Sequence, residues 1–419
     1  MRILVVGSGG REHVLAWGCA ASGHEVLSLP GNPGMAAVGA RVEGSVEELD
    51  GVVRAARELD VDLVVVGPEA PLSAGLVDRL ASAGVAAFGP SAAGARIESS
   101  KTYCKEVLER GSVPTARWIG ADSLDDALGA VATAGAPCVV KADGLAAGKG
   151  VVVASTREEA EDAVRACFDG RFGDAGSKVV IEECLEGPEL SLLVLADGRT
   201  LVPLPAAQDH KRIGEGDTGP NTGGMGAYSP VPGVDTGLVD EIMDTIVEPT
   251  VWALAKDGVT YKGVLYCGLM LTGEGPKVIE YNCRFGDPEA QAVIPRLGGD
   301  LGEALAACAH GALAADMVSV RPEAALTVVA AAEGYPGTPR KGDVISGLDD
   351  AAAVDEALVF HAGTAMSGGD VVTAGGRVLA VTGLGADLAT ARDRAYSAIE
   401  RISWDGMYVR RDIGHRALG

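Results

Sequence analysis

Three polar residues alternate with apolar ones near residue 280, and their side chains suit phosphoryl transfer. Glu280, Asn282 and Arg284 are separated by Tyr281 and Cys283. If this stretch is a strand, the alternation places the three polar side chains on one face. Carboxylate and amide oxygens bind Mg²⁺ or Mn²⁺, and a guanidinium group can neutralise a phosphoryl group during transfer. The pattern therefore predicts a metal site at Glu280 and Asn282 with a catalytic Arg284. A strand with a merely polar outer face is the alternative.

A glycine-rich stretch with two lysines, residues 141–150, predicts a site for a triphosphate. Its glycines permit close approach of the backbone, while Lys141 and Lys149 supply positive charge. The stretch is not a Walker A loop, because Gly150 follows Lys149 where serine or threonine is required and the next expected element is a strand. We predict a hairpin lid over a nucleotide. An ordinary glycine-rich turn is the alternative.

Three further stretches carry polar groups in loops. Residues 181–189 offer carboxylates and backbone groups between two expected strands, where an adenosine could bind. Residues 208–212 (QDHKR) provide both charges needed by a zwitterionic amino acid, and residues 220–226 (PNTGGMG) can form a nest of N–H groups for an anion. Plain surface loops are the alternative for all three. For His210, a structural role is preferred to that of a catalytic base.

The N-terminal stretch 7–12 (GSGGRE) follows an expected strand and opens a helix. It is a poor dinucleotide fingerprint, because Glu12 stands where the third glycine belongs and the second strand ends in Leu29-Pro30 without an acidic residue. A helix N-terminus with free N–H groups beside Arg11 instead suits one phosphate of a small substrate. A tight turn without a ligand is the alternative.

The elements that must position these residues form three regions. Short apolar runs at 3–6, 25–29, 63–66 and 86–88 alternate with helical stretches at 12–21 and 73–83, which predicts a parallel sheet with glycine-rich loops at one edge. A single helix is expected from Ser91 to about Arg110, with a boundary near residue 100. Strands are expected at 138–141, 151–153, 179–182, 189–195, 263–272 and 277–282, and helices at 158–168, 236–256 and 388–402. We therefore predict an α/β protein with regions 1–100, 101–320 (with a lid at about 114–190) and 321–419.

Composition excludes several classes of protein. The chain has 419 residues, of which 47% are hydrophobic and 22% charged, and these values indicate a folded protein. Its net charge of −23 opposes binding to nucleic acid. No apolar run reaches the length of a membrane span, and no leader is expected before Met1. The 8 cysteines contain no C-x-x-C pair, so we expect reduced thiols and a cytoplasmic protein.

Taken together, these stretches closely resemble the phosphoribosylamine–glycine ligase (glycinamide ribonucleotide synthetase) family of the ATP-grasp superfamily. The resemblance covers essentially the whole chain and is carried by ordered blocks that include VVGSGGREH, PGNPG, VVGPEAPL, KADGLAAGKGV, EECLEGPELS, QDHKR, GPNTGGMGAYSP, VIEYNCRFGDPE, GGRVLAVTGLG and RDIGHRA. It implies an ATP-grasp fold with an N-terminal Rossmann-like domain, a two-part central domain and a small C-terminal domain rich in strands.

The resemblance also implies a reaction and the residues that perform it. ATP would phosphorylate the carboxylate of glycine, and the amine of 5-phosphoribosylamine would attack the glycyl phosphate to give glycinamide ribonucleotide, ADP and phosphate. Lys101, Lys141, Gly148 and Lys149 would contact the phosphates, Glu182, Glu183 and Leu185 the adenine, and Glu189 the ribose. Glu280 and Asn282 would hold Mg²⁺ or Mn²⁺, while Arg284, Lys141 and Asp287 would be catalytic. Asp287 and the QDHKR stretch, with Asp209, His210 and Lys211, are the expected glycine site; Gly9, Gly10, Arg11, Glu12 and Glu69 are the expected phosphoribosylamine site. Asn221 and Arg284 are also expected to bind a substrate.

Some questions stay open at this point. Many ATP-grasp enzymes place another metal-binding carboxylate on the preceding strand, but here residues 265–270 read LYCGLM, so the number of metal ions is undetermined. An ATP-grasp carboxylase or a ligase with a different acceptor is one alternative. A nucleotide sensor without turnover is another, although a sensor has no need of groups that neutralise a transition state. We expect a monomer.

Overall fold

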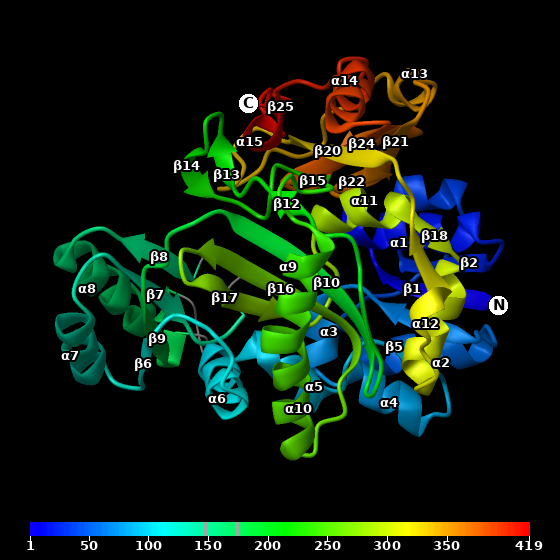
Figure 1. Cartoon of the computed structure of the whole chain (residues 1–419). Helices are drawn as coiled ribbons and strands as arrows, with labels where there is room; N and C mark the ends of the chain where they lie inside the picture. The colour runs from blue at the N-terminus through cyan, green and yellow to red at the C-terminus, as the bar shows by residue number, and fades with distance from the viewer. Residues whose placement is uncertain (146–149, 172–175) are drawn as a thin grey trace.

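The computed structural model describes residues 1–145, 150–171 and 176–419. The first region is a five-stranded parallel sheet with the strand order β3-β2-β1-β4-β5, flanked by helices (Figure 1). Its strands are β1 (Arg2–Gly7), β2 (Glu25–Pro30), β3 (Ala40–Arg41), β4 (Leu63–Val66) and β5 (Ala87–Phe88). Its helices are α1 (Gly10–Ala21), α2 (Leu49–Glu58), α3 (Glu69–Ser73), α4 (Leu76–Ser82) and α5 (Ala92–Ser99). The predicted parallel sheet is confirmed.

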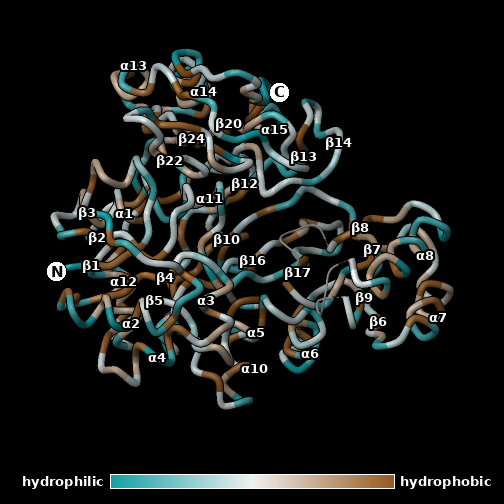
Figure 2. The backbone as a smooth tube through the Cα atoms, turned by 180° about the vertical axis from the view of Figure 1, so that it is seen from behind, coloured by the Kyte–Doolittle hydropathy of each residue, from teal (hydrophilic) through white to brown (hydrophobic). Residues whose placement is uncertain are grey.

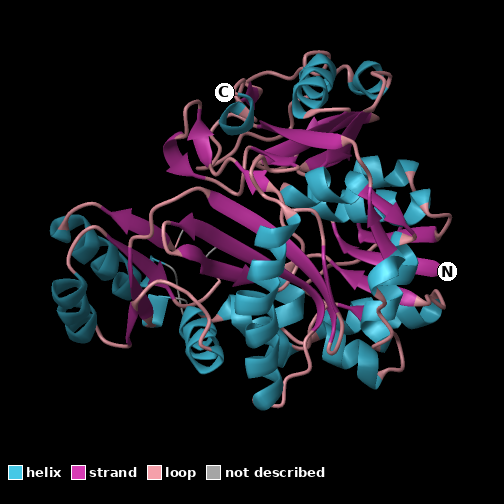
Figure 3. Ribbon diagram, viewed as in Figure 1, coloured by secondary structure: helices cyan, strands magenta, loops and turns pink. Residues whose placement is uncertain are grey.

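The middle of the chain forms two four-stranded antiparallel sheets (Figure 3). The smaller sheet contains β6 (Trp118–Ala121), β7 (Cys138–Ala142), β8 (Val151–Ala154) and β9 (Val179–Glu183) and is covered by α7 (Leu124–Ala134) and α8 (Arg157–Ala166). The larger sheet contains β10 (Glu189–Asp197), β11 (Leu201–Pro203), β16 (Lys262–Thr272) and β17 (Gly275–Asn282). The small sheet and its two helices share a core of small apolar residues that is separate from the main core. The expected hairpin of β7 and β8 is confirmed.

The third sheet has the order β12-β15-β20-β24-β21 and crosses the boundary proposed at residue 320. Its strands β20 (Ala324–Ala331), β21 (Ala357–His361) and β24 (Arg377–Gly385) come from the last part of the chain. Two others, β12 (Gln208–Asp209) and β15 (Gly226–Ser229), come from the middle. In Figure 2, hydrophobic segments run along β20 and β24, which α14 (Leu388–Ile399) covers. The loop between β12 and β15, with the hairpin β13 (Arg212–Gly214) and β14 (Thr218–Asn221), is thus anchored in the third sheet.

One of the expected helices is wrong because it is interrupted, and another is confirmed in its extent with a π-helical turn inside it. The helix expected from Ser91 to Arg110 is broken at Ser100, which is extended and separates α5 from α6 (Lys101–Gly111). The Ser100 hydroxyl accepts the N–H of Tyr103, an N-cap that begins a new helix there. The helix expected at 236–256 is α9 (Thr236–Ile242), a π-helical turn at Met243–Val247 and α10 (Glu248–Lys256). No helix in the described part of the chain is long and apolar enough to cross a membrane.

The break at Ser100 lies where the first and second regions meet, and the role of its hydrogen bonds can be tested by mutation. The Asp143 carboxylate accepts hydrogen bonds from the Ser100 hydroxyl (3.1 Å) and from the N–H of Thr102 (2.5 Å), in the first turn of α6. Replacing Asp143 by alanine is expected to destabilise the protein by about 1–2 kcal/mol, because this capping is lost. It should also raise the KM for ATP, since α6 carries Lys101. Thermal unfolding and steady-state kinetics measure both effects. The exposed Asp122, changed to alanine, is the control; equal behaviour of the two variants would contradict this prediction.

Candidate functional site

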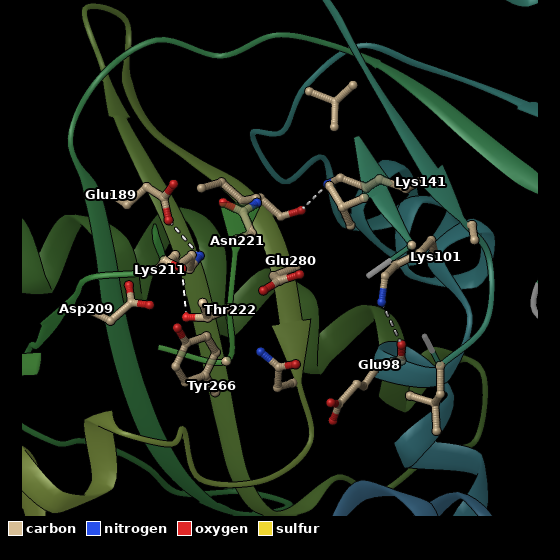
Figure 4. A pocket seen from close by; sticks show the side chains of 18 of the residues that line it. Glu98, Lys101, Lys141, Glu189, Asp209, Lys211, Asn221, Thr222, Tyr266 and Glu280 are labelled. Atoms are coloured by element: carbon tan, nitrogen blue, oxygen red, sulfur yellow. Dashed lines mark hydrogen bonds and ion pairs between the residues drawn. The ribbon is translucent and has the colours of Figure 1, made fainter. Parts of the chain in front are cut away.

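A cavity of about 480 Å³ lies between the two antiparallel sheets and the first region. Figure 4 shows side chains from both sheets, from the 209–222 loop and from the start of α6 around it. Most of the residues predicted from the sequence line it, namely Arg11, Glu69, Lys101, Lys141, Glu182, Glu183, Leu185, Glu189, Asp209, Lys211, Asn221, Glu280, Asn282, Arg284 and Asp287. Residues far apart in the chain thus meet in one place.

Lys141, on β7, is held at the cavity by contacts with β9 and β17. Its ammonium group lies 3.0 Å from the Oε2 atom of Glu182 on β9 and donates to the carbonyl oxygen of Ile279, 2.9 Å away. That carbonyl belongs to a β-bulge, because the register between β16 and β17 shifts at Ile279. A second lysine, Lys105 on α6, lies 3.3 Å from the Oε1 atom of Glu182, and burial lowers its pKa. The Glu182 carboxylate therefore fixes Lys141 while lining the cavity, and its expected contact with adenine stays a prediction.

The other residues expected around a nucleotide are spread along the cavity, and Glu189 lies beside Lys211 (Figure 4). Lys101, at the start of α6, donates from Nζ to the carbonyl oxygen of Glu98 (3.1 Å). Glu183 forms an ion pair with Arg117 (2.7 Å), and Glu189 forms one with Lys211 (2.6 Å). The expected contacts of Gly148 and Lys149 lie outside the described residues.

The predicted phosphoryl-transfer face lies at the end of β17. Glu280, Asn282 and Arg284 all line the cavity, while Tyr281 and Cys283 are buried on the opposite side. Burial acts to raise the pKa of Glu280, but Lys211, Lys101, Lys141 and Arg284 outweigh it, so the pKa is lowered. A half-buried carboxylate thus stays ionised on the same face as the amide oxygen of Asn282. Hard oxygen ligands of this kind fit Mg²⁺ or Mn²⁺.

Arg284 is held by acidic residues of the first region. Its NH2 atom lies 3.3 Å from the Glu98 carboxylate and 3.3 Å from the Asn282 amide oxygen, and its Nε lies 3.5 Å from the Glu69 carboxylate. The backbone N–H of Cys283 also donates to Glu98 (2.7 Å). Burial acts to lower the pKa of Arg284, but the carboxylates of buried Glu98 and half-buried Glu69 outweigh it and raise the pKa, so Arg284 remains a cation that is oriented before any substrate binds.

The opposite half of the cavity combines acidic and basic side chains. Asp209 ends β12, Lys211 lies in the segment that joins β12 to β13, and Asn221 ends β14. Burial raises the pKa of Asp209 to about 7, with Glu289 and Glu189 acting in the same direction and Lys211 opposing them. Lys211 has a raised pKa because Asp209 and Glu189 outweigh its burial. This half therefore offers a cation and a carboxyl group that titrates near neutral pH.

Sequence reasoning missed Arg377, which reaches the cavity from β24. Its guanidinium group lies 3.3 Å from the Asp287 carboxylate and donates to the carbonyl oxygens of Asp287 (2.6 Å) and Gly223. Arg377 outweighs burial and lowers the pKa of Asp287. Lys105 and Tyr266 were also missed; Tyr266 donates to the Glu289 carboxylate (2.9 Å). The block GGRVLAVTGLG contains Arg377 and offered a signal, although nothing in its local pattern indicates which side chains it meets.

The N-terminus of α1 differs from the expectation. The N–H of Gly9 is not free, because it donates to the Oε2 atom of Glu12 (2.6 Å) in a capping box. The other oxygen of Glu12 accepts from Arg11 (2.6 Å). Arg11 and Glu69 reach the cavity, whereas Gly9, Gly10 and Glu12 are not among the residues that line it. The N-terminus of α1 is thus capped by Glu12, a residue of the helix itself.

His210 also lies apart from the cavity. It is fully buried, its Nε2 atom accepts the N–H of Gly414 (3.0 Å), and its Nδ1 atom faces Asp217 (3.4 Å). Burial lowers its pKa to about 4, so the ring is neutral and its proton is on Nδ1. Contact with a substrate in this cavity, as the resemblance implies, is not supported; the structural role preferred from the residues alone fits these contacts.

Comparison with known proteins gives a consistent picture. Residues 1–98, 99–290 and 325–416 match the N domain, the ATP-grasp (A) domain and the C domain of phosphoribosylglycinamide synthetase, respectively. The phosphoribosylamine–glycine ligase of Mesorhizobium japonicum is 50% identical over 100% of this chain and 99% of its own length.

Solved structures agree with the sequence comparison. The crystal structure of phosphoribosylamine–glycine ligase from Thermotoga maritima has a TM-score of 0.87 at 35% identity and covers 99% of this chain and 100% of its own. Biotin carboxylase from Campylobacter jejuni, at 15% identity and a TM-score of 0.73 over 97% of this chain and 92% of its own, shares the fold. The chain therefore belongs to the phosphoribosylglycinamide synthetase family of ATP-grasp proteins.

Proposed function

We propose that this protein joins glycine to 5-phosphoribosylamine at the expense of ATP, giving glycinamide ribonucleotide, ADP and phosphate in purine biosynthesis. Membership of the family and the full-length similarity to phosphoribosylamine–glycine ligases support this activity. The observation that carries the proposal is that one cavity combines the lysines expected at a triphosphate, the Glu280–Asn282–Arg284 face and the Asp209–Lys211 pair.

In the nucleotide half, Lys101 and Lys141 bind phosphate oxygens. Lys141 is suited to this role because Glu182 and the Ile279 carbonyl hold its ammonium group in place. Glu183, Leu185 and Glu189 surround the nucleoside. Glu280 and Asn282 bind the divalent cation. When bound, ATP would supply the phosphoryl group for the glycine carboxylate, and the cation would neutralise negative charge on the phosphates.

Arg284 steadies the phosphoryl group as it is transferred. A carboxylate is a poor electrophile, and conversion to an acyl phosphate provides a good leaving group for attack by an amine. The site must therefore bring two anions together, the glycine carboxylate and the phosphates of ATP. A guanidinium group that is already fixed by Glu98 and Glu69 neutralises their charge without reorganisation during the reaction. A closed cavity also keeps water from the acyl phosphate.

In the opposite half, Asp209, Lys211, Asn221 and Asp287 bind glycine. Asp209 or Asp287 pairs with the ammonium group of the amino acid, and Lys211 pairs with its carboxylate. Arg11 and Glu69 face the same cavity from the first region and bind phosphoribosylamine. Glu12 supports Arg11 by accepting its Nε–H, and it is itself fixed by the N–H of Gly9. We further propose that the protein acts in the cytoplasm as a monomer; its 8 free cysteines agree with a reducing compartment.

The KM for glycine is expected to rise as the pH falls below about 7. The folded pKa of Asp209 is raised to about 7, so its carboxylate is lost as the pH falls through that value, and with it the partner for an ammonium group. The rise approaches tenfold per pH unit, while the KM for ATP changes little. Kinetics between pH 6 and 8 measure it, and Asp209→Asn should remove this pH dependence. A profile that is the same in the variant would assign the titration to another group.

The activity is tested by ADP release from purified protein with ATP and Mg²⁺. Glycine and freshly generated phosphoribosylamine are added separately and then together, and glycinamide ribonucleotide is identified by mass spectrometry. Release that requires both substrates supports the proposal. Release with bicarbonate or another amino acid in place of glycine would show that the protein is a ligase or carboxylase of different specificity. The absence of release under any condition would overturn the proposal.

A further inference from the structure

A segment near the end of the chain, residues 408–416, binds the segment 209–217 that carries part of the cavity. The two lie side by side in Figure 1, where β25 (Tyr408–Val409) and α15 (His415–Leu418) adjoin β13 and β14. The Tyr408 hydroxyl donates to the carbonyl oxygen of Ile213 (2.8 Å), and the N–H of Gly216 donates to the Asp412 carboxylate (2.8 Å). These bonds join parts of the chain about 200 residues apart, since the Gly216–Asp412 bond alone spans 196 positions.

Asp217 is the centre of this junction. One of its oxygens accepts from Arg410 (2.9 Å), and the other accepts from both the Nε and NH2 atoms of Arg416 (2.9 and 2.8 Å). Arg410 is completely buried and also donates to the carbonyl oxygen of Arg212 (3.0 Å). Arg416 reaches further along the segment and donates to the carbonyl oxygen of Asp209 (2.9 Å). The two arginines therefore hold the backbone on both sides of Lys211 by hydrogen bonds.

His210, Asp217 and His415 also lie close enough together for their ligand atoms to suggest a metal site, being within 4.8 Å of one another. Two guanidinium groups already occupy both oxygens of Asp217, and their charge opposes a cation at the same place. His210 uses its Nε2 atom to accept the N–H of Gly414. The cluster is thus better explained as ion pairs of Asp217 with Arg410 and Arg416, whose guanidinium groups also bond to the backbone.

We infer that residues 408–416 act as a positioning segment for the amino-acid half of the cavity, with Arg416 and Asp217 as positioning residues for Asp209 and Lys211. This inference rests on the proposed function, because it assigns that half to glycine. The physical reason is that Arg416 and Arg410 donate to the backbone carbonyl oxygens of Asp209 and Arg212, on the two sides of Lys211. Without these bonds, the segment keeps only the pairing of β12 with β15 and of β13 with β14. Misplacement of about 1 Å is enough to weaken a binding site by an order of magnitude or more.

The effect should be confined to one substrate. Lys141 and Glu182 are held by the small sheet and by β17, and the bonds described above do not extend to them. Loss of the junction is therefore expected to raise the KM for glycine far more than the KM for ATP, because it reaches the nucleotide half only through the ion pair of Lys211 with Glu189. A general loss of folding would instead affect both substrates in proportion.

The test compares Arg416→Met with a matched control, Arg411→Met. Arg416 is suitable because its side chain is about one-third exposed and Asp217 keeps Arg410 as a partner. The Arg411 side chain belongs to the same segment but pairs with Glu400 (2.9 Å). We expect Arg416→Met to raise the KM for glycine about tenfold with less than a twofold change for ATP. Arg411→Met should alter neither value, and Arg416→Lys should fall between them, since one ammonium group cannot replace the planar fork of arginine.

A second measurement is independent of turnover. Hydrogen–deuterium exchange of the complete protein should become faster at residues 208–217 in Arg416→Met and remain unchanged at 138–145 and in Arg411→Met. Unchanged exchange at 208–217, or a KM for glycine equal to that of the unaltered protein, would overturn the inference while leaving the proposed function intact. Failure of the unaltered protein to use glycine would overturn the function itself, which the ADP-release experiment detects separately.

Discussion

Replacing Glu280 by glutamine is expected to lower kcat by about 10³-fold or more while the affinity for ATP falls by less than about tenfold. The substitution keeps the size of the side chain but removes a half-buried carboxylate whose pKa is lowered by Lys211, Lys101 and Lys141. Those cations then lose one nearby negative charge, although Lys141 keeps Glu182 and Lys211 keeps Glu189 as partners. The proposed divalent cation loses its carboxylate ligand. Because charge develops on the phosphoryl group mainly in the transition state, the loss appears in kcat.

Steady-state kinetics and direct titration of ATP separate the two effects. Glu274→Gln is the matched control, because this glutamate is exposed in the turn between β16 and β17 and pairs with Lys277. The control should retain full activity. Glu280→Gln with unchanged kcat would remove the metal face from the mechanism, and an equal loss of kcat and ATP affinity would assign Glu280 to binding alone.

Replacing Arg284 by methionine is expected to lower kcat by about 10²–10³-fold, the range found when one preorganised donor to a developing charge is removed. Glu98 would still accept the N–H of Cys283, and Glu69 would still lie 3.9 Å from Arg11, so neither carboxylate is left without a partner. The protein should therefore fold, which thermal unfolding verifies. Formation of ADP in a single turnover with ATP and glycine measures the loss at the phosphoryl-transfer step.

Arg284→Lys distinguishes charge from geometry. A lysine keeps the positive charge, but it cannot contact Glu98, Glu69 and Asn282 at once. We expect it to recover only part of the rate. Recovery to the full rate would show that position 284 needs a cation alone, and a methionine variant within tenfold of the unaltered protein would contradict the role of Arg284.

Local patterns were sufficient to predict most of the fold. Apolar runs bounded by glycine-rich loops identified the strands of the first sheet, and alternation of Glu280, Asn282 and Arg284 correctly placed these side chains on one face. The break at Ser100 escaped prediction because it depends on Asp143, which meets Ser100 only after the chain has folded. The recruitment of β12 and β15 into the third sheet escaped for the same reason.

The residues of the candidate site also fall into those that a local pattern predicts and those that it does not. Charged residues in glycine-rich loops were found from composition and spacing, whereas Arg377, Lys105 and Tyr266 lie in ordinary strands or helices where a polar residue carries no local signal. The capping of α1 by Glu12 shows the converse: a glycine-rich turn beside an arginine indicated an open anion site, but a carboxylate of the same turn already accepts the N–H of Gly9.

The third sheet also has a consequence for how the protein folds. Strand β15 pairs with β20, so that Ala227 is opposite Thr327, and His210 is bonded to Gly414, 204 positions away. Such distant pairings make folding slow and require nearly the whole chain to be present. During synthesis on the ribosome, the parallel sheet and the nucleotide half can form early, whereas the amino-acid half must wait for the last residues to emerge. The nascent protein would thus acquire its ATP site before it acquires a site for the amino acid.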